Sequence, residues 1–497
     1  MKNYYFDLTD VLAFARYNST LSGIQRVSLR IIGHLIEKHG RERIKLIAFH
    51  PNLRRVVEIK SDFLTPDYSF DMNEFAAHCE LQTDAPLKSY LRYKYKKSYE
   101  RRFHRFRLKL LNYATGGRIF KKLGLDGLSA PGGVREVRLT QNDTVIILGA
   151  TWDFLPFLEY LKVAKSEINC EIVAFIHDLI PIVTPEHVGD RVPDKFYKWL
   201  IIVAGLADKF LVNSNHTKKD LSWFFDSEGI LHKSISVVPL AHEFIADKPE
   251  FLLQHITCTR LKSPEKSPNQ LRIRASILNA THLPYALFVG TLESRKNIWT
   301  LVNAWKALLD EVGPTIPRLI LAGKPGWGKD DADDLLRSTG NLNGHVRICE
   351  RPLDFELAFL YQQCLFTVFP SYYEGWGLPI GESLWFKKFV ITSSNSSMPE
   401  VGQDMVDYVD PYSFNSVYNG LKKVILDNEY LKKRTQQIDF KRLRTWEIVA
   451  GDLWLALEPS RSKMVDTSLP PPTQSNSHGD VHVEQSIQSS QKSIQSF

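Results

Sequence analysis

The sequence contains little cysteine, no long apolar run and no secretory leader. Its five cysteines are scattered and form no C-x-x-C pair, which argues against a disulfide framework or a zinc site and fits a reducing compartment. The longest apolar run, Trp199 to Ala207, has nine residues, about half of the ~18 that a bilayer span needs. No apolar stretch or small-residue cleavage site follows Met1. We therefore expect a soluble, cytoplasmic protein.

Length and composition predict a globular chain of several domains. The 497 residues suggest two or three domains, and 43% hydrophobic with 24% charged residues is enough for real cores. Short β-branched runs alternate with helical patterns such as 24–37 and 195–206, which is typical of parallel βαβ units. The predicted strands are 44–49, 144–148, 171–176, 209–212 and 235–239 in a first series, and 285–289, 318–322, 346–348, 365–369, 389–392 and 408–409 in a second.

These two series predict an α/β fold with two doubly wound, Rossmann-like domains. A ligand site is expected in a central cleft, at the carboxyl ends of the strands. The serine-rich tail, with its Pro470–Pro472 run, cannot bury enough apolar surface to fold and is predicted to be disordered. The predicted boundaries are an acceptor-side domain over 1–240, a linker or insertion over 241–283, a nucleotide-sugar-binding domain over 284–440, a closing helix over 441–458 and the tail over 459–497.

One segment carries a larger net positive charge than the chain as a whole. Residues 88–122, within a helical insertion predicted at about 87–122, contain thirteen basic residues against Glu100 alone, whereas the chain has a formal net charge of +7. At helical spacing, one face of this segment is largely aromatic with cationic flanks. It could meet an anionic membrane surface or pack on its own domain, and nothing else resembles a nucleic-acid module. The stripe consists of Tyr95, Tyr99, Phe103, Phe106, Leu110 and Tyr113.

Two carboxylates stand eight residues apart after a predicted strand. Glu374 lies in a glycine-rich turn, and Glu382 lies in the first turns of the helix that follows. Glycines let a backbone approach a ligand closely, and a helix N-terminus favours an anion. Each acid could accept hydrogen bonds from sugar hydroxyls. Each also has an ordinary explanation, as an exposed loop carboxylate and as an acid that complements a helix dipole.

Two adjacent cations, Arg295 and Lys296, occupy another strand-to-helix junction. They stand in the segment Gly290-Thr-Leu-Glu-Ser-Arg-Lys-Asn297. Cations oppose the dipole at a helix start, so a bound diphosphate would explain them better than a solvated turn, with arginine as a fork and lysine as a point charge.

A phosphate-loop pattern at Gly323–Lys329 is rejected as an NTPase site. Asp330 stands where that loop requires the serine or threonine that binds magnesium. Asp330, Asp331, Asp333 and Asp334 are explained as acids that open a helix. No metal and no other cofactor is predicted.

These motifs together resemble the retaining, nucleotide-sugar-dependent GT-B glycosyltransferases of family four, the glycosyl transferases group 1. The similarity rests on the E-x7-E pair, the Arg295-Lys296 pair, "HDLIP" at 177–181 and "MPEVGQD" at 398–404. "SGIQRV" at 22–27 resembles members that act in bacterial O-antigen and capsule synthesis. The resemblance covers residues 285–427 well, is patchier before them and is absent from the basic insertion and the tail. Gln403 stands where the family often has glycine, and Gly23 is single where many members have a pair.

The resemblance implies roles for individual residues. Glu382 would hold the nucleotide ribose, Glu374 would contact a donor-sugar hydroxyl, and Arg295 with Lys296 would neutralise the leaving diphosphate. Gly23, between the first strand and first helix, would let backbone approach the phosphates. His177 would lie at the reaction centre, although a core histidine paired with Asp178 is the alternative. The remaining implied nucleotide-sugar contacts are Gly290, Gly323, Gly375, Gly377 and Leu378.

The implied reaction moves a hexose, with a GDP-mannose-type donor favoured, to a growing and lipid-linked bacterial surface polysaccharide with retention of configuration. The diphosphate would help to deprotonate the acceptor, with no enzyme nucleophile required. The expected partners are a nucleotide sugar, a saccharide or lipid-linked saccharide acceptor and, through residues 88–122, an anionic membrane surface; nucleic acid is not expected. A non-catalytic GT-B scaffold and a nucleotide-sugar epimerase or hydrolase remain as alternatives.

Overall fold

We describe the protein from a computed structural model. The chain divides into two compact units, residues 1–457 and 458–497. The described residues are 2–15, 21, 23–64, 72–79, 81, 91, 98–115, 118, 134–231, 233–244, 273–328 and 330–458. Most of the predicted linker, much of the predicted insertion, Lys329 and the tail from 459 on therefore lie outside the described part of the chain.

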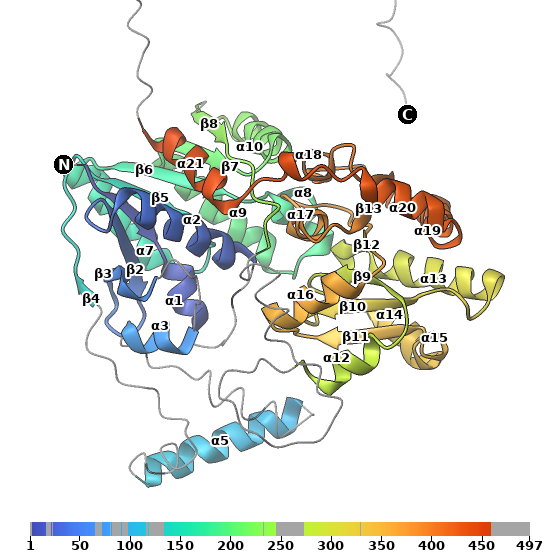
Figure 1. Ribbon diagram of the computed structural model, residues 1–497. Coiled ribbons are helices and arrows are strands. Elements are labelled where there is room, and N and C mark those ends of the chain that lie inside the picture. The colour runs from blue at the N-terminus through green and yellow to red at the C-terminus, as the bar shows by residue number, and fades with distance from the viewer. Residues whose placement is uncertain are drawn as a thin grey trace, which may run out of the picture. The chain divides into compact units, whose positions relative to one another are not determined.

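An eight-stranded sheet organises the first half of the described chain (Figure 1), in the order β4-β3-β2-β1-β5-β6-β7-β8. All pairs are parallel except β2–β3 and β3–β4. The five strands predicted here are confirmed, whereas β1, β3 and β4 were not predicted because they are short or carry charged residues. The strands are β1 (Tyr4–Asp7), β2 (Ile44–His50), β3 (Arg55–Ile59), β4 (Val134–Glu136), β5 (Thr144–Ile147), β6 (Glu171–Ile176), β7 (Lys209–Val212) and β8 (Ser234–Val237).

The helices of this first domain bury one face against the sheet. Helix α2 (Gly23–His39), for example, buries Val27, Ile31 and Leu35, which recur at helical spacing. The others are α1 (Thr9–Ala15), α3 (Met72–His78), α7 (Leu155–Val163), a π-helical turn (Ala164–Ile168), α8 (Ile180–Val183), α9 (Val192–Leu206) and α10 (Asn215–Ser227), with 3-10 turns at Ser61–Phe63 and Pro185–His187.

A six-stranded, fully parallel sheet organises the second half, in the order β11-β10-β9-β12-β13-β14. All six strands predicted here are confirmed. Four of them are buried along most of their length, and such strands appear in the sequence as nearly continuous apolar, β-branched runs. They are β9 (Tyr285–Val289), β10 (Arg318–Gly323), β11 (Val346–Glu350), β12 (Phe366–Phe369), β13 (Phe389–Ser393) and β14 (Asp407–Val409).

The last helix returns to the first domain. The ring of Trp454 on α21 stacks on His39 of α2 at 3.8 Å and lies 4.7 Å from Tyr4 of β1. Residues 441–458, predicted as a closing helix, thus contain α21. The helices of the second half are α12 (Ala275–Ala280), α13 (Ile298–Val312), α14 (Asp330–Ser338), α15 (Gly340–Asn343), α16 (Asp354–Gln363), α17 (Leu378–Trp385), α18 (Met398–Gly402), α19 (Phe414–Leu426), α20 (Asn428–Gln436) and α21 (Trp446–Leu457), with 3-10 turns at Ser294–Lys296 and Phe440–Arg442.

The basic segment forms a helix, α5 (Ser98–Ala114). No residue from Tyr99 to Ala114 is buried. The predicted stripe is therefore exposed over its described part: Phe103 is 64%, Phe106 70%, Leu110 58% and Tyr113 88% exposed. Among the described helices, none combines the length and the apolar character that a bilayer span requires.

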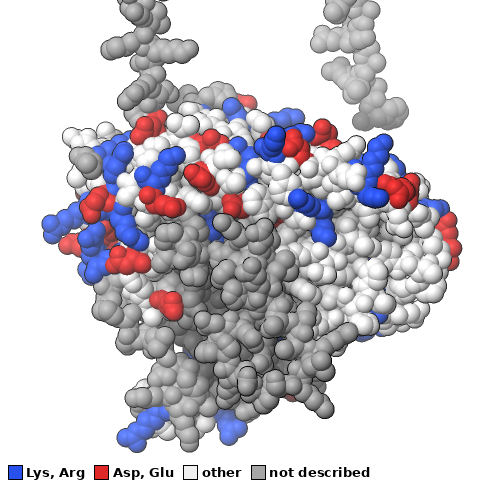
Figure 2. Space-filling view, in the orientation of Figure 1, with Lys and Arg blue, Asp and Glu red and all other residues white. Residues whose placement is uncertain are grey.

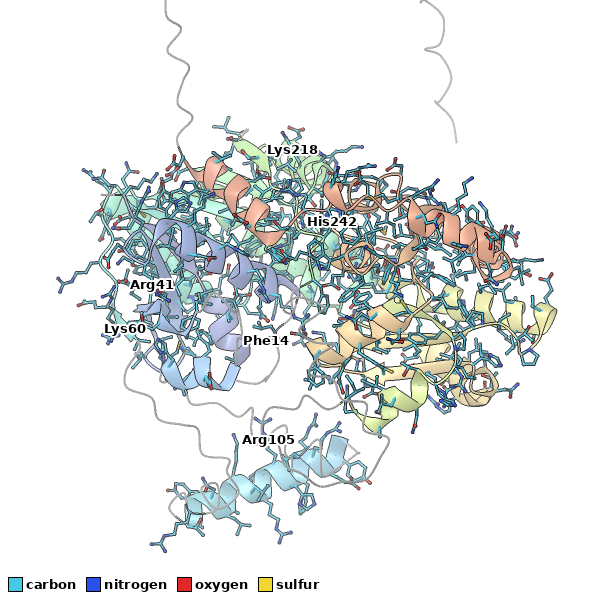
Figure 3. All side chains as sticks on the ribbon, in the orientation of Figure 1. Phe14, Arg41, Lys60, Arg105, Lys218 and His242 are labelled. Atoms are coloured by element: carbon cyan, nitrogen blue, oxygen red, sulfur yellow. The ribbon has the colours of Figure 1, made fainter. Side chains whose placement is uncertain are left out.

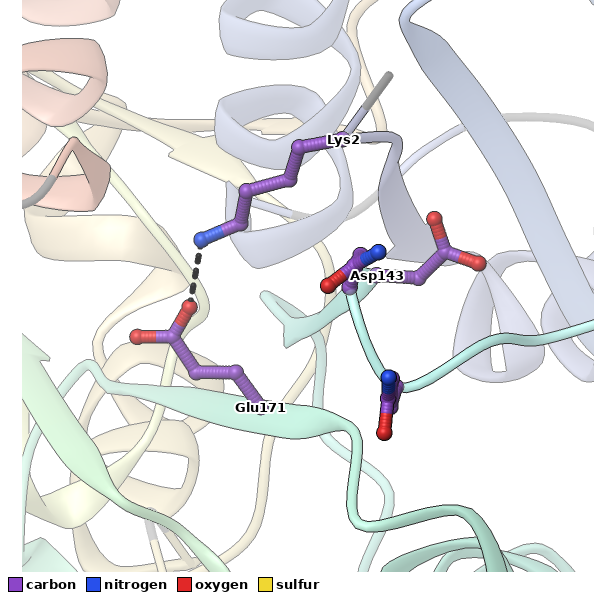
Figure 4. Close-up of a pocket in the computed structure, with 5 residues that line it drawn as sticks. Lys2, Asp143 and Glu171 are labelled. Atoms are coloured by element: carbon purple, nitrogen blue, oxygen red, sulfur yellow. Dashed lines mark hydrogen bonds and ion pairs between the residues drawn. The ribbon is translucent and has the colours of Figure 1, made fainter.

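A polar pocket lies at the amino ends of the first sheet's strands (Figure 4). Lys2 Nζ is 2.7 Å from Glu171 Oε2, and Asp143 accepts hydrogen bonds from Asn3. These pairs connect Lys2 and Asn3, which precede β1, to residues at or next to the starts of β6 and β5. The predicted site residues follow the opposite, carboxyl ends of the strands.

Candidate active site

Glu374 lies at the centre of a buried ion-pair cluster. The loop that follows β12 carries it to the carboxyl end of the second sheet, next to the 3-10 turn that follows β9. Lys296 Nζ is 2.5 Å from Glu374 Oε1, and Arg295 Nη1 is 2.8 Å from Glu374 Oε2. Arg295 also pairs with Glu293 at 2.7 Å. The structure thus brings together three predicted residues from two loops.

The cluster fixes the charges of its members. Burial alone would raise the pKa of Glu374, but Arg295 and Lys296 lower it to about 2. Burial, followed by repulsion from Arg295, lowers the pKa of Lys296. Burial also opposes the charged form of Arg295, yet Glu374 and Glu293 raise its pKa. Glu374 is consequently a permanent carboxylate at neutral pH, and its two oxygens are shared between two cations.

Glu382 has a different environment from Glu374. It lies on α17, is 6% exposed, and accepts a hydrogen bond from the Tyr361 hydroxyl at 2.8 Å. Burial raises its pKa to about 7, against the opposing effects of Tyr361 and Arg26. One E-x7-E pair therefore holds a fixed charge at its first position and a group that titrates near neutral pH at its second.

His177 follows β6, and its ring is hydrogen-bonded to a backbone carbonyl group. Its Nε2 lies 2.7 Å from the carbonyl oxygen of Leu148. Because a carbonyl only accepts, Nε2 carries the proton and Nδ1 is the acceptor nitrogen. Burial lowers the pKa of His177 to about 4, so the ring is neutral. Asp178, the predicted alternative partner, instead accepts a hydrogen bond from the amide of Ile180.

Glycines of the E-x7-E loop let this loop approach the first domain. A Cβ on Gly375 would lie 2.3 Å from the carbonyl oxygen of His177, so only glycine fits. Ser214 Oγ in turn donates to the carbonyl oxygen of Gly375 at 3.0 Å. On α17, a Cβ on Gly381 would lie 2.9 Å from Cα of His242, which Figure 3 labels. His177 and Glu374 therefore lie on segments that pack directly together.

The other predicted residues lie around the same cluster, with one correction. Gly290 has a φ of 152° and lies against the Lys296 side chain, and Gly323 packs on the carbonyl oxygen of Gly290. Gly377, with a φ of 102°, precedes α17, which Leu378 begins. Gly23 is not between the first strand and the first helix: α1 intervenes, because Asp7 accepts a hydrogen bond from the amide of Thr9 and starts that helix. Gly23 instead opens α2, and a Cβ on it would lie 4.0 Å from Leu378.

A small pocket borders the ion-pair cluster. It is lined by Val289, Lys296, Phe369, Ser371, Glu374, Gly377, Pro379, Ile380 and Met398. Across the described residues, no three His, Cys, Asp or Glu side chains come together in a way that could hold a metal. The four aspartates from Asp330 to Asp334 open α14, as predicted.

The sequence interpretation missed several residues at this site. Arg26 on α2 pairs with Asp354 on α16 at 2.5 Å. Glu400 of the "MPEVGQD" segment accepts hydrogen bonds from the amides of Asn215 and His216, at the start of α10. Arg26 stands inside the "SGIQRV" motif, so the motif pointed to it, but its partner lies 328 residues away.

Comparisons with known proteins agree with this architecture. A family model described as "Glycosyl transferases group 1" matches residues 269–442. An O-antigen chain mannosyltransferase B from Escherichia coli is 36% identical over 146 residues, which is 29% of this chain and 38% of that protein. A serotype-specific mannosyltransferase WbdA from E. coli is 22% identical over 276 residues, 55% of this chain and 31% of that protein. The chain thus spans about a third of the length of these curated relatives.

Two solved structures share the fold over nearly the whole chain. A sucrose-phosphate synthase from Thermosynechococcus elongatus aligns with a TM-score of 0.53 and 15% identity, over 92% of this chain and 99% of that one. Anabaena HepE, solved with UDP and glucose, aligns with the same TM-score at 13% identity, over the same shares of the two chains. At these identities the likeness carries the fold alone: two Rossmann-like domains in the GT-B arrangement.

Proposed function

We propose that this chain, which carries a glycosyl transferases group 1 domain, is a retaining glycosyltransferase that moves a hexose from a nucleotide sugar to a saccharide acceptor. The observation that carries the proposal is the buried cluster in which Arg295 and Lys296 share Glu374. Glu382 and His177 complete the group of residues that would act. A scaffold protein has no need of two desolvated cations at the carboxyl end of a sheet.

The two cations would stabilise the leaving group. As the bond between the anomeric carbon and the phosphate oxygen breaks, negative charge collects on the nucleoside diphosphate. Arg295 and Lys296 would meet that charge in a site with little water, where electrostatic stabilisation is strong. The acceptor oxygen would bond to the same face of the anomeric carbon and pass its proton to the leaving diphosphate. No carboxylate of the enzyme forms a covalent intermediate in this scheme.

Glu374 and the donor would compete for these cations. In the structure both oxygens of Glu374 are committed to Arg295 and Lys296. A diphosphate carries more negative charge than one carboxylate and would displace it in part, freeing Glu374 to accept a hydrogen bond from a sugar hydroxyl. Glu382 would bind the ribose, and neutral His177 would accept a hydrogen bond at Nδ1 from the donor sugar.

We further propose a GDP-mannose-type donor and a growing, lipid-linked bacterial surface polysaccharide as the acceptor. The support is the similarity to the E. coli relatives, which are mannosyltransferases, one of them of the O-antigen chain. The experiment is a screen of nucleotide sugars scored by released nucleoside diphosphate, with and without a lipid-linked saccharide. The anomeric configuration of the product then tests retention.

Each alternative gives a different outcome in that screen. Release of nucleoside diphosphate without acceptor would favour a nucleotide-sugar hydrolase, conversion of the donor to an isomeric nucleotide sugar would favour an epimerase, and no turnover of any donor would favour a scaffold. Lys296→Ala and Glu382→Ala should each remove most of the transfer activity. Lys306→Ala, which breaks an exposed pair with Asp310 on α13, is the matched control and should leave it unchanged. Transfer near the wild-type rate in both site variants would refute the site assignment.

We also propose that α5 binds the anionic surface of a membrane, at its cytoplasmic face. Its apolar stripe falls within an arc of about 80° at 100° per residue, and this stripe is exposed. Isolated helices of this length are only marginally stable in water, so a partner for the stripe would stabilise α5. Along the upper and left parts of the described surface in Figure 2, basic and acidic side chains are interspersed, whereas α5 carries five basic residues and one acid.

Charge-matched variants test this proposal. Each cation near an anionic surface contributes about 1 kcal/mol, so neutralising Arg101, Arg102, Arg105 (labelled in Figure 3) and Arg107 together should release the protein from phosphatidylserine-containing vesicles. Neutralising four exposed lysines elsewhere removes the same charge and should leave binding intact. Binding that is unaffected by the first set, or reduced equally by both, would refute the assignment of α5. The control lysines are Lys218, Lys219, Lys432 and Lys433.

A further inference from the structure

The start of α2 presents an unusual cation to the second domain. Arg26 stands in the first turn of a 17-residue helix that has no acid there. A cation at that end opposes the helix dipole by about 0.3–1 kcal/mol. Its side chain is 19% exposed, and Nη2 is 2.5 Å from Asp354 Oδ1 on α16. The position is electrostatically costly in itself, and the carboxylate of Asp354 offsets that cost.

One packing contact and two electrostatic effects associate this helix start with α17 and the loop after β10. Gly23, one turn before Arg26, lies against Leu378, the first residue of α17. Arg26 lies close enough to Glu382 to favour its charged form, an effect that opposes the burial of that acid. It also helps to lower the pKa of Lys324, after burial and Arg351. Arg26 is thus within electrostatic range of both the acid proposed to bind ribose and a second cationic group.

We propose that Arg26 is a donor-positioning residue that the first domain contributes to the nucleotide subsite, where its guanidinium binds the phosphate oxygens of a nucleoside diphosphate. This inference rests on the proposed function, because it takes Glu382 as the neighbour of the nucleotide ribose. Asp354 occupies one guanidinium nitrogen in the structure. The guanidinium fork has five N–H donors, so the others can meet a phosphate while Asp354 orients the group.

Phosphate binding by Arg26 predicts different effects of substitution than an Arg26–Asp354 ion pair that only joins the two domains. If Arg26 binds phosphate, the nearby carboxylate of Asp354 repels the ligand, and Asp354→Asn keeps an acceptor oxygen while removing that charge. Affinity for the diphosphate should then stay the same or rise. If the ion pair only holds the domains together, Asp354→Asn and Arg26→Gln should weaken binding alike.

The test measures GDP and UDP binding to the full chain by calorimetry, with the tighter nucleotide used throughout. We expect Arg26→Gln to weaken binding at least ten-fold, Arg26→Lys to weaken it less because the charge remains without the fork, and the free nucleoside to bind both proteins alike. The control is Arg135→Gln, which removes an equally short guanidinium pair with Glu58 and should leave binding unchanged. Melting temperatures verify that each variant is folded.

Two outcomes would overturn the inference. Equal binding of the diphosphate by the wild type and Arg26→Gln, or an equal loss in Arg26→Gln and Asp354→Asn, would remove Arg26 from the ligand site and leave the proposed function standing. A wild-type protein that binds neither GDP nor UDP would overturn the inference and the proposed function together.

Discussion

Replacing Glu382 by glutamine should change how the stability of the protein depends on pH. The carboxyl is buried next to Tyr361, and its pKa is raised to about 7 from 4.5, mainly by that burial. The native state therefore holds a proton that the unfolded state releases. The stability that this proton provides is fully present below pH 4.5 and is lost as the pH rises through 7. The difference in pKa corresponds to about 3 kcal/mol.

Three neighbouring side chains influence the pKa of Glu382 in addition to its burial. Tyr361 donates a hydrogen bond to it, Arg26 favours its charged form, and Asp354 favours its neutral form. Asp7 and Asp10 also have pKa values raised by burial, to about 8 and about 6. The stability of the wild type therefore depends on pH in this range through these two acids as well. Their contributions cancel in the difference between wild type and Glu382→Gln.

The assay is thermal unfolding of the two proteins in the absence of nucleotide, from pH 5 to pH 8.5. We expect the wild type to lose stability relative to the variant by about 3 kcal/mol across this range, which is several degrees in melting temperature for a domain of this size. Nucleotide affinity of the wild type should rise over the same range, because a ribose hydroxyl donates best to a carboxylate. Parallel melting curves at all pH values would refute the burial argument for Glu382.

Three further changes test other parts of the structure. Gly375→Ala forces a Cβ to within 2.3 Å of the His177 carbonyl and should abolish most nucleoside diphosphate release, whereas Gly451→Ala, where nothing lies within 4 Å, should be neutral. Arg274→Met leaves the fully buried Glu356 side chain without its cation and should destabilise the chain by about 3–5 kcal/mol; a loss below 1 kcal/mol in denaturant titrations would contradict this. Because burial lowers the pKa of His177 to about 4, its contribution to stability falls as the pH drops from 6.5 to 4. His177→Gln should reduce that acid sensitivity, and unchanged acid melting would count against a buried ring.

The sequence was most informative where structure is local. The six strands of the second sheet were predicted from their short β-branched and apolar runs, and α5 was predicted from its spacing. The short strand β1, with only Tyr4 to Asp7, offers no period to detect, although it forms the middle of its sheet. Gly23 was misplaced for the same reason: α1 is a seven-residue helix, which two hydrogen bonds from Thr9 to Asp7 help to start.

Residue types and their order along the chain already pointed to acids, cations and a histidine at the carboxyl ends of parallel strands. Only the tertiary structure decided which of them meet. Lys296 and Glu374 are 78 residues apart and form one ion pair, and Arg26 meets Asp354 across 328 residues. The pKa values of Glu374 and Glu382 separate, to about 2 and about 7, because one acid is buried with two cations and the other is buried with a tyrosine. Burial and charge proximity are properties of the folded chain, and no spacing in the sequence encodes them.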